Sequence, residues 1–173
     1  MKISFKSRIE RLDYLKLNHI TVTEAQLLQF RKDSEHSSVY NQRFIITIND
    51  KVTWRGGSVS LGDNKAYITI STARMKKVFA ALGDIVQVEL ERDDSKYGFD
   101  VPEEFEEVLN QDVEAKHQFE SLTLGKQRAI IYLVIQLKSS QKRIEKSLFF
   151  MENLKRAPKG QVTMRHVLGK DLP

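Results

Sequence analysis

The residue types that most often perform chemistry are few in this sequence and are poorly spaced for it. The chain of 173 residues contains no cysteine, which excludes disulfides, a thiolate nucleophile and Cys-ligated zinc. Its four histidines are far apart and form no HxxxH pair: His19, His36, His117 and His166. No GxSxG nucleophile motif is present. The sequence therefore predicts no catalytic residues, no metal ligands and no cofactor, although spacing alone leaves open a metal site assembled from distant residues.

Two stretches approach known site patterns without completing them. Gly57 and Gly62 have the spacing of a phosphate loop, but Asp63 and Asn64 stand where Lys and Ser or Thr are needed, so a hairpin is predicted there. The carboxylates of "ERDD" (91–94) lack the glycine and the distal Glu of an EF-hand, and they fit a polar strand end. No spacing among the 23 Asp and Glu residues singles out an acid–base pair.

The segment "SSQKRIEKSLFFMENLKR" (139–156) is the strongest candidate for a binding surface. At 100° per residue its apolar side chains fall within an arc of roughly 160°, and most of the cations lie opposite. Phe149 falls among the polar residues. The predicted contacts of this surface with an anionic partner are Lys138, Lys142, Arg143, Lys146, Phe149, Lys155 and Arg156.

Three interpretations of this basic helix are open. Charged runs usually face water, so the cations could be a solvated face whose Phe149 is covered by a neighbouring unit. They could instead bind a nucleic acid, an acidic protein or a lipid headgroup. A third interpretation pairs them with the acidic helices expected at 102–120, where each exposed ion pair would contribute only about 0–1 kcal/mol.

Charge is distributed in blocks along the chain. Residues 1–83 carry 14 Lys and Arg against 7 Asp and Glu, a net charge of +7. Residues 84–120 carry 3 against 13, a net charge of −10. Residues 121–170 carry 11 against 2, a net charge of +9, and Asp171 completes the total of +5. Such blocks can attract outside partners or one another.

The first half has the pattern of short strands separated by turns. "RFIITI", "KVTWRGGSVSL", "AYITIST" and "IVQVEL" recur at the intervals of a small barrel or sandwich. Thr23 and Gln26 form a capping-box pattern that predicts a short helix, and 31–42 is predicted as a loop. A second helix, "ARMKKVFAAL", is expected to bury one face and to stop at Gly83. The predicted buried residues of that face are Met75, Val78, Phe79 and Leu82.

The second half has the pattern of helices. "VPEEFEEVL" places glutamates in a first helical turn, and Asp112 and Thr123 are predicted N-caps of two further helices. "AIIYLVIQL" is apolar all round and fits a buried strand as well as a buried helix. The segment 161–173 is expected as a loose tail or one extra strand. The predicted fold is α+β: a β-barrel domain at 1–97, a helical bundle at 98–160 and a tail at 161–173.

Two parts of the chain resemble known families. Residues 101–160, with "VPEEF", "AKHQFESL" and "KQRAIIYLVIQLKSSQKRIEKSL", resemble the C-terminal helical domain of YdeI/OmpD-associated proteins, also called bacteriocin-protection proteins. Residues 3–97 resemble the uncharacterised barrel domain often joined to it, which is similar to AbrB-like double-split β-barrels. The resemblance implies that "AIIYLVIQL" is helical and suggests envelope stress or tolerance of cationic peptides. It brings no catalytic or ligand residues with it.

Composition and resemblance together predict a bacterial cytoplasmic protein. No signal-peptide core or run of ~20 apolar residues is present, so no membrane span is predicted. The predicted function is a non-catalytic binding or stress-tolerance module. Two alternatives are sequence-independent nucleic-acid binding through the basic helix, and an enzyme with a small-molecule pocket in the barrel or between the two domains. The sequence identifies neither the partner nor the oligomeric state.

Overall fold

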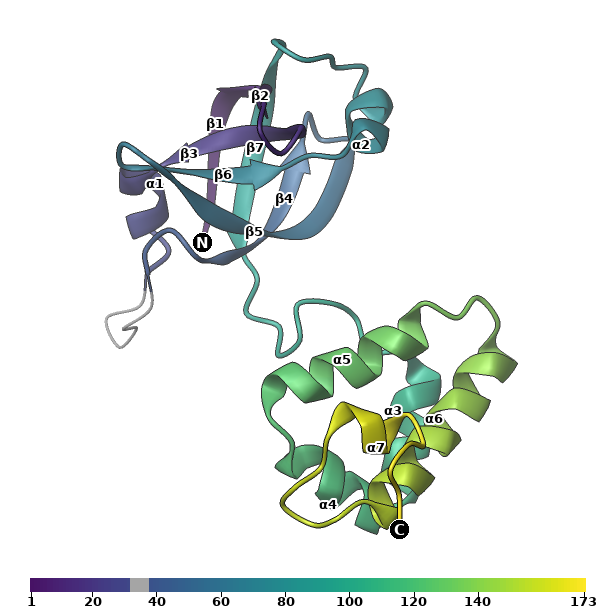
Figure 1. The fold of residues 1–173 in the computed structure, drawn as a ribbon. Helices are drawn as coiled ribbons and strands as arrows, with labels where there is room; N and C mark the ends of the chain where they lie inside the picture. The colour runs from purple at the N-terminus through teal and green to yellow at the C-terminus, as the bar shows by residue number, and fades with distance from the viewer. Residues whose placement is uncertain (32–37) are drawn as a thin grey trace. The chain divides into compact units, whose positions relative to one another are not determined.

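A computed structural model describes residues 1–31 and 38–173. The chain forms two compact units, Met1–Gly98 and Phe99–Pro173. The first unit contains a curled antiparallel sheet with two short helices, and the second unit is helical (Figure 1). The predicted α+β class, with a barrel-like sheet followed by helices, is confirmed. Six residues of the predicted loop at 31–42 lie outside the described residues.

The sheet of the first unit has seven strands in the order β1-β7-β4-β5-β6-β3-β2, and every described pairing is antiparallel. The strands are β1 (Lys2–Arg8), β2 (Glu10–Leu12), β3 (Leu17–Thr23), β4 (Arg43–Ile48), β5 (Val52–Gly62), β6 (Lys65–Thr69) and β7 (Ile85–Arg92). Because β1 and β2 are consecutive in the chain but lie at opposite edges of the sheet, the sheet must curl toward closure.

The Ser7 side chain connects β1, at one edge of the sheet, to β3, which lies next to the other edge. The backbone N–H of Thr21 in β3 donates to the Ser7 Oγ at 3.0 Å, and the same hydroxyl lies 3.3 Å from the Thr21 carbonyl oxygen. Ser7 interrupts the apolar alternation of its strand, yet it is buried. A polar side chain therefore satisfies backbone groups at the seam, where no strand pairing is made.

A hydrophobic core fills the interior of the curled sheet. On β7 the residues Val86, Val88 and Leu90 are buried, as the alternation of that strand predicts. Phe44 on β4 packs edge-on to Phe30 at 5.0 Å between ring centroids, and both belong to this core. An interior occupied by packed side chains argues against a small-molecule site inside the barrel.

The two short helices of this unit are α1 (Glu24–Leu28) and α2 (Thr72–Lys77). The predicted capping box of Thr23 and Gln26 is present at α1. For α2 the prediction is wrong in part: Met75 and Val78 are buried, but Phe79 and Leu82 are 87% and 52% exposed. The reason is that α2 ends at Lys77, so the helical period that placed the last two residues inward stops before them.

The helical unit contains five helices. They are α3 (Glu103–Gln111), α4 (Val113–Ser121), α5 (Leu124–Ile135), α6 (Ser140–Arg156) and α7 (Met164–Val167). The Asp112 and Thr123 side chains cap α4 and α5 as predicted. Most of "AIIYLVIQL" is helical, as the family resemblance implies, and Ile130, Ile131 and Val134 are buried.

The segment after residue 160 is neither a loose tail nor a strand. It forms α7, whose Val167 is fully buried, and the buried Asn153 of α6 donates its Nδ2 hydrogen to the Val167 carbonyl oxygen at 2.9 Å. Thr163 and His166 form a capping box at the start of α7. Because a helix of four residues is unstable alone, packing on α6 must stabilise it, and a local pattern does not reveal that packing.

Two glycines at the same backbone angle test how closely this segment packs on α6. Gly169 and Gly160 both have φ +78°, but a Cβ on Gly169 would lie 2.9 Å from the Phe149 Cζ, whereas a Cβ on Gly160 meets nothing within 4 Å. Gly160→Ala should cost about 1–2 kcal/mol through the backbone alone. Gly169→Ala should lower the free energy of unfolding further, as measured by urea denaturation. Equal losses would contradict the packing of this segment on Phe149.

Candidate functional site

The basic helix α6 is anchored by one buried face. The Ser139 hydroxyl accepts the Lys142 backbone N–H at 3.2 Å and starts the helix. Phe150, Met151 and Leu154 are buried, in agreement with the predicted apolar arc. Ile144 is half-buried and Leu148 is 54% exposed, so the predicted arc is wider than the surface that neighbouring helices cover.

Two of the predicted anion-binding cations are paired with acids inside the helical unit. The Arg143 guanidinium donates to the Glu104 carboxylate of α3 at 2.7 Å and to the Leu137 carbonyl oxygen at 3.0 Å. The Lys155 ammonium lies 2.9 Å from the carboxylate of Asp112, the residue that caps α4. The acidic segment 102–120 therefore packs on α6 and neutralises part of it, as the third interpretation of the sequence expected.

The other predicted contacts are scattered along α6. The Lys146 ammonium lies 5.0 and 5.1 Å from the ring centroids of Phe149 and Phe150. Phe149 is 42% exposed and is in contact with the segment around Gly169. Arg156 donates to the Pro173 carbonyl oxygen at 3.3 Å.

Lys138 and Lys142 are exposed near the start of α6, and within the described residues neither has an acidic partner. Lys142 and Arg156 stand about 21 Å apart along the axis at 1.5 Å per residue. The seven residues therefore do not form one compact patch. Their binding to an anion stays a prediction.

The Glu104–Arg143 pair has a measurable electrostatic signature. The hydrogen bond from Arg143 is the largest cause that lowers the pKa of the Glu104 carboxyl from 4.5 to about 2, and hydrogen bonds from backbone and from Ser140 add to it. For Lys155, the contact with Asp112 raises the pKa of the ammonium, and the contact with Glu152 adds to this. Both pairs hold their charged forms across the neutral range.

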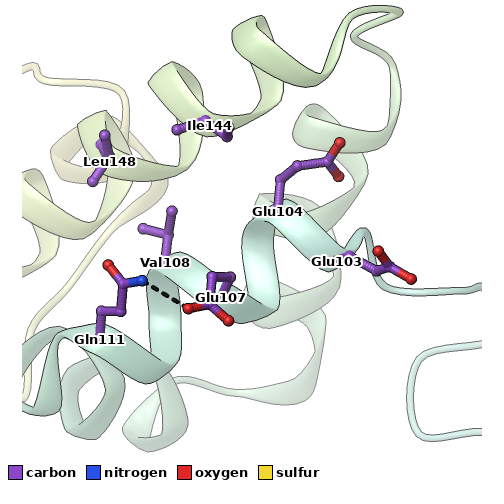
Figure 2. Close-up of a pocket in the computed structure, with 7 residues that line it drawn as sticks. All are labelled: Glu103, Glu104, Glu107, Val108, Gln111, Ile144 and Leu148. Carbon is purple, nitrogen blue, oxygen red and sulfur yellow. Dashed lines mark hydrogen bonds between the residues drawn. The ribbon is translucent and has the colours of Figure 1, made fainter.

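A groove that the sequence did not predict lies between α3 and α6. It has a volume of about 470 Å³, and Figure 2 shows Val108 pointing from α3 toward α6, where Ile144 and Leu148 lie. A second hollow of about 380 Å³ continues along the same helix pair and shares Val108, Gln111 and Leu148 with the first. The full lining of the first hollow is Glu103, Glu104, Glu107, Val108, Gln111, Ile144 and Leu148.

This groove combines an apolar floor with an acidic rim. Val108 is buried, Ile144 is half-buried, and Leu148 is more than half exposed. Glu103 and Glu107 are exposed on the α3 side, where the Gln111 amide donates to the Glu107 carboxylate at 2.7 Å. In the sequence, one helical turn separates Glu103 from Glu107 and Glu107 from Gln111, which places all three on one face of α3. This spacing is the pattern from which the polar rim of the groove could have been predicted.

The histidines are not gathered into a site. His166 caps α7, where its Nδ1 accepts the Thr163 N–H at 3.2 Å, and His117 is exposed. His19 is buried on β3, and His36 lies outside the described residues. Within 1–31 and 38–173, no three or more His, Cys, Asp or Glu side chains are placed to hold a metal ion.

Comparison with known families gives a match within the C-terminal part of the chain. Residues 98–157 match the family model described as "Bacteriocin-protection, YdeI or OmpD-Associated". This range runs through α3, α4, α5 and α6 and therefore includes both sides of the groove. The resemblance inferred for the C-terminal region is confirmed. A comparison with curated proteins gives no significant match. Among the described helices, none is long and apolar enough to cross a bilayer.

The lowered pKa of Glu104 predicts how the stability of the fold depends on pH. A carboxyl whose pKa is lower in the folded state stabilises the fold above its unfolded pKa, and this contribution is lost as pH falls toward the folded value. Glu104→Gln should therefore destabilise the chain at pH 6, and the difference from wild type should shrink between about pH 5 and pH 2. Urea denaturation across this range measures the difference.

Glu103→Gln is the matched control, because Glu103 is exposed on the same helix turn. It should change the free energy of unfolding by no more than a few tenths of a kcal/mol at pH 6. A Glu104→Gln deficit that stays constant with pH would contradict the ion pair with Arg143.

Proposed function

We propose that the helical unit is a non-catalytic binding module that takes a cationic amphipathic peptide in the groove between α3 and α6. The observation that supports this proposal is the apolar floor of the groove beside the carboxylates of Glu103 and Glu107, which form no ion pair within the described residues. The groove is formed by two helices of the family-matched region. Docking of an amphipathic helix into such a groove is a common mode of peptide recognition.

The apolar floor supplies the driving force for binding. Leu148 is 54% exposed in the middle of a 17-residue helix, and Ile144 lies one turn before it. Val108 of α3 lies between them and is 8% exposed. A ligand side chain that covers Leu148 would remove apolar surface from water at about 25 cal/mol per Å².

The acidic rim selects the charge of the ligand. Helix α3 carries four glutamates and no basic residue. Glu104 is used by Arg143, whereas Glu103 and Glu107 are exposed, with no cationic partner among the described residues. An ion pair at such a rim contributes only about 0–1 kcal/mol, so the carboxylates act mainly by steering cationic ligands and by disfavouring anionic ones.

The family description supports a peptide ligand. The description of the matching family includes bacteriocin protection. The sequence resemblance to this family suggests tolerance of cationic peptides. A module that sequesters a cationic peptide needs no catalytic group.

Substitution of the groove floor tests this function. A synthetic amphipathic helical peptide of leucines and lysines serves as the probe, and its affinity for the full chain is measured by fluorescence anisotropy. Leu148→Lys should lower the affinity at least about tenfold, because it removes an apolar contact and adds a like charge. Leu124→Lys is the matched control, since Leu124 is 48% exposed on α5 and does not line the groove.

The charge of the probe provides the second half of the test. A peptide with the same leucines but glutamates in place of lysines should bind more weakly, and Glu103→Lys with Glu107→Lys should reverse the order of the two peptides. If Leu148→Lys and Leu124→Lys bind the cationic peptide equally well, the groove is not the site. Binding of only the acidic peptide would point instead to the cations of α6.

A further inference from the structure

The connection between α2 and β7, together with the first residue of β7, exposes three large apolar side chains of the barrel unit. Phe79 is 87% exposed, Leu82 is 52% exposed and Ile85 is 60% exposed. Only small residues and Asp84 separate them in the sequence. Scattered exposed hydrophobic residues are ordinary on a protein surface, but three within seven positions form a local apolar surface that requires an explanation.

The backbone presents Phe79 to solvent at an energetic cost. Its φ of +55° lies in the left-handed region, which is rare for a bulky residue and costs on the order of 1–3 kcal/mol. The Phe79 and Ala80 N–H groups donate to the carbonyl oxygens of Lys76 and Met75 at 3.1 and 3.0 Å. These hydrogen bonds fix the turn, and the Phe79 ring stays almost fully exposed.

The rest of the connection is also held in place. The Gly83 N–H donates to the Ile9 carbonyl oxygen at 2.8 Å, and the Arg8 guanidinium donates to the Gly83 carbonyl oxygen at 2.8 Å. The Asp84 carboxylate accepts the Ala81 N–H at 2.8 Å. The apolar side chains therefore stand on an ordered support and not on a free loop.

Cations surround this apolar surface. The Lys51 ammonium lies 5.2 Å from the centre of the Phe79 ring. Lys76 and Lys77, both exposed, form the last turn of α2 immediately before Phe79. Two acids are close in sequence: Asp84, which accepts the Ala81 amide, and Asp50, which precedes Lys51. Counted with Arg8, which donates to the Gly83 carbonyl oxygen, these residues include four cations and two acids and therefore carry a net positive charge.

We propose that this surface, formed by Phe79, Leu82, Ile85, Lys51, Lys76 and Lys77, docks onto an anionic lipid membrane. Exposed apolar side chains that enter the boundary of the acyl chains, combined with lysines for acidic headgroups, supply the two signals that stable peripheral binding requires. This surface shares no residue with the peptide groove, because every residue involved belongs to the barrel unit.

Single-stranded nucleic acid is the competing partner and fits the surface less well. Recognition of unpaired bases relies on several aromatic rings for stacking, and here Phe79 is accompanied by the aliphatic side chains of Leu82 and Ile85. Three of the four cations counted here are lysines, which act as point charges toward headgroups and lack the planar fork of arginine.

Co-sedimentation of the full chain with lipid vesicles tests the proposal. The chain should bind vesicles of mixed phosphatidylserine and phosphatidylcholine, and should bind vesicles of phosphatidylcholine alone at least about tenfold more weakly. Phe79→Gly should weaken binding to the mixed vesicles about tenfold or more. Because glycine adopts a φ of +55° without strain, this variant should unfold at the same or a higher urea concentration than wild type.

Two further variants separate the contributions. Lys76→Gln with Lys77→Gln should lower affinity for the mixed vesicles about tenfold or more and reduce its sensitivity to salt. Leu61→Ser is the matched control and should leave binding unchanged. Leu61 is 37% exposed near the β5–β6 turn. This turn lies beside α1, because its Asn64 carbonyl oxygen accepts the Glu24 N–H of α1. Leu61 is therefore far from the proposed surface, since α1 and α2 lie at opposite ends of this unit (Figure 1).

Three results would overturn the proposal. The first is absence of binding to the mixed vesicles, and the second is unchanged binding by Phe79→Gly. The third is binding of a labelled single-stranded oligonucleotide, measured by anisotropy, in place of vesicle binding, which would assign the surface to nucleic acid.

Discussion

The packing of α6 against α3 and α4 is the constraint on which the helical unit depends. Phe150 and Leu154 are fully buried, and the ion pairs of Arg143 with Glu104 and of Lys155 with Asp112 lie beside this buried face. Burial of the large side chains supplies most of the stability, because partly exposed ion pairs contribute little. The Glu104 pair connects α3 to α6 beside the groove, and the Asp112 pair connects the start of α4 to the last turn of α6.

The same packing changes the functional interpretation of the basic helix α6. In the sequence, α6 is a run of cations that suggests an anionic partner. In the fold, two of these cations are paired with acids, and the exposed half of the apolar arc is adjacent to glutamates of α3. A surface that seemed cationic thus borders an acidic, partly apolar groove, and this arrangement is the basis of our proposal that the ligand is cationic.

Features that depend on neighbouring residues could be predicted from the sequence. The caps at Thr23, Asp112 and Thr123 follow from side chains that bond backbone N–H groups two or three positions later. The alternation of β7 and the buried Phe150 and Leu154 follow from the periods of strand and helix. The family match confirms the resemblance of the helical region that was inferred from its motifs.

Features that depend on distant partners could not be predicted. Glu104 and Arg143 are 39 positions apart, so no local pattern joins them. The orientation of Phe79 was missed because the helix ends two residues before it and the backbone then turns to positive φ. The helix α7 was missed because its stability comes from contacts with α6, such as the hydrogen bond from Asn153.

Chemical-shift mapping of the isotope-labelled full chain, titrated with the leucine–lysine peptide, tests the central claim most directly. The claim is that the groove between α3 and α6 is the binding surface of the helical unit. It predicts that the largest amide shifts occur around Val108, Gln111 and Leu148, with little change around Lys138 and Lys142. Shifts confined to the start of α6, or the absence of saturable shifts on α3, would contradict it.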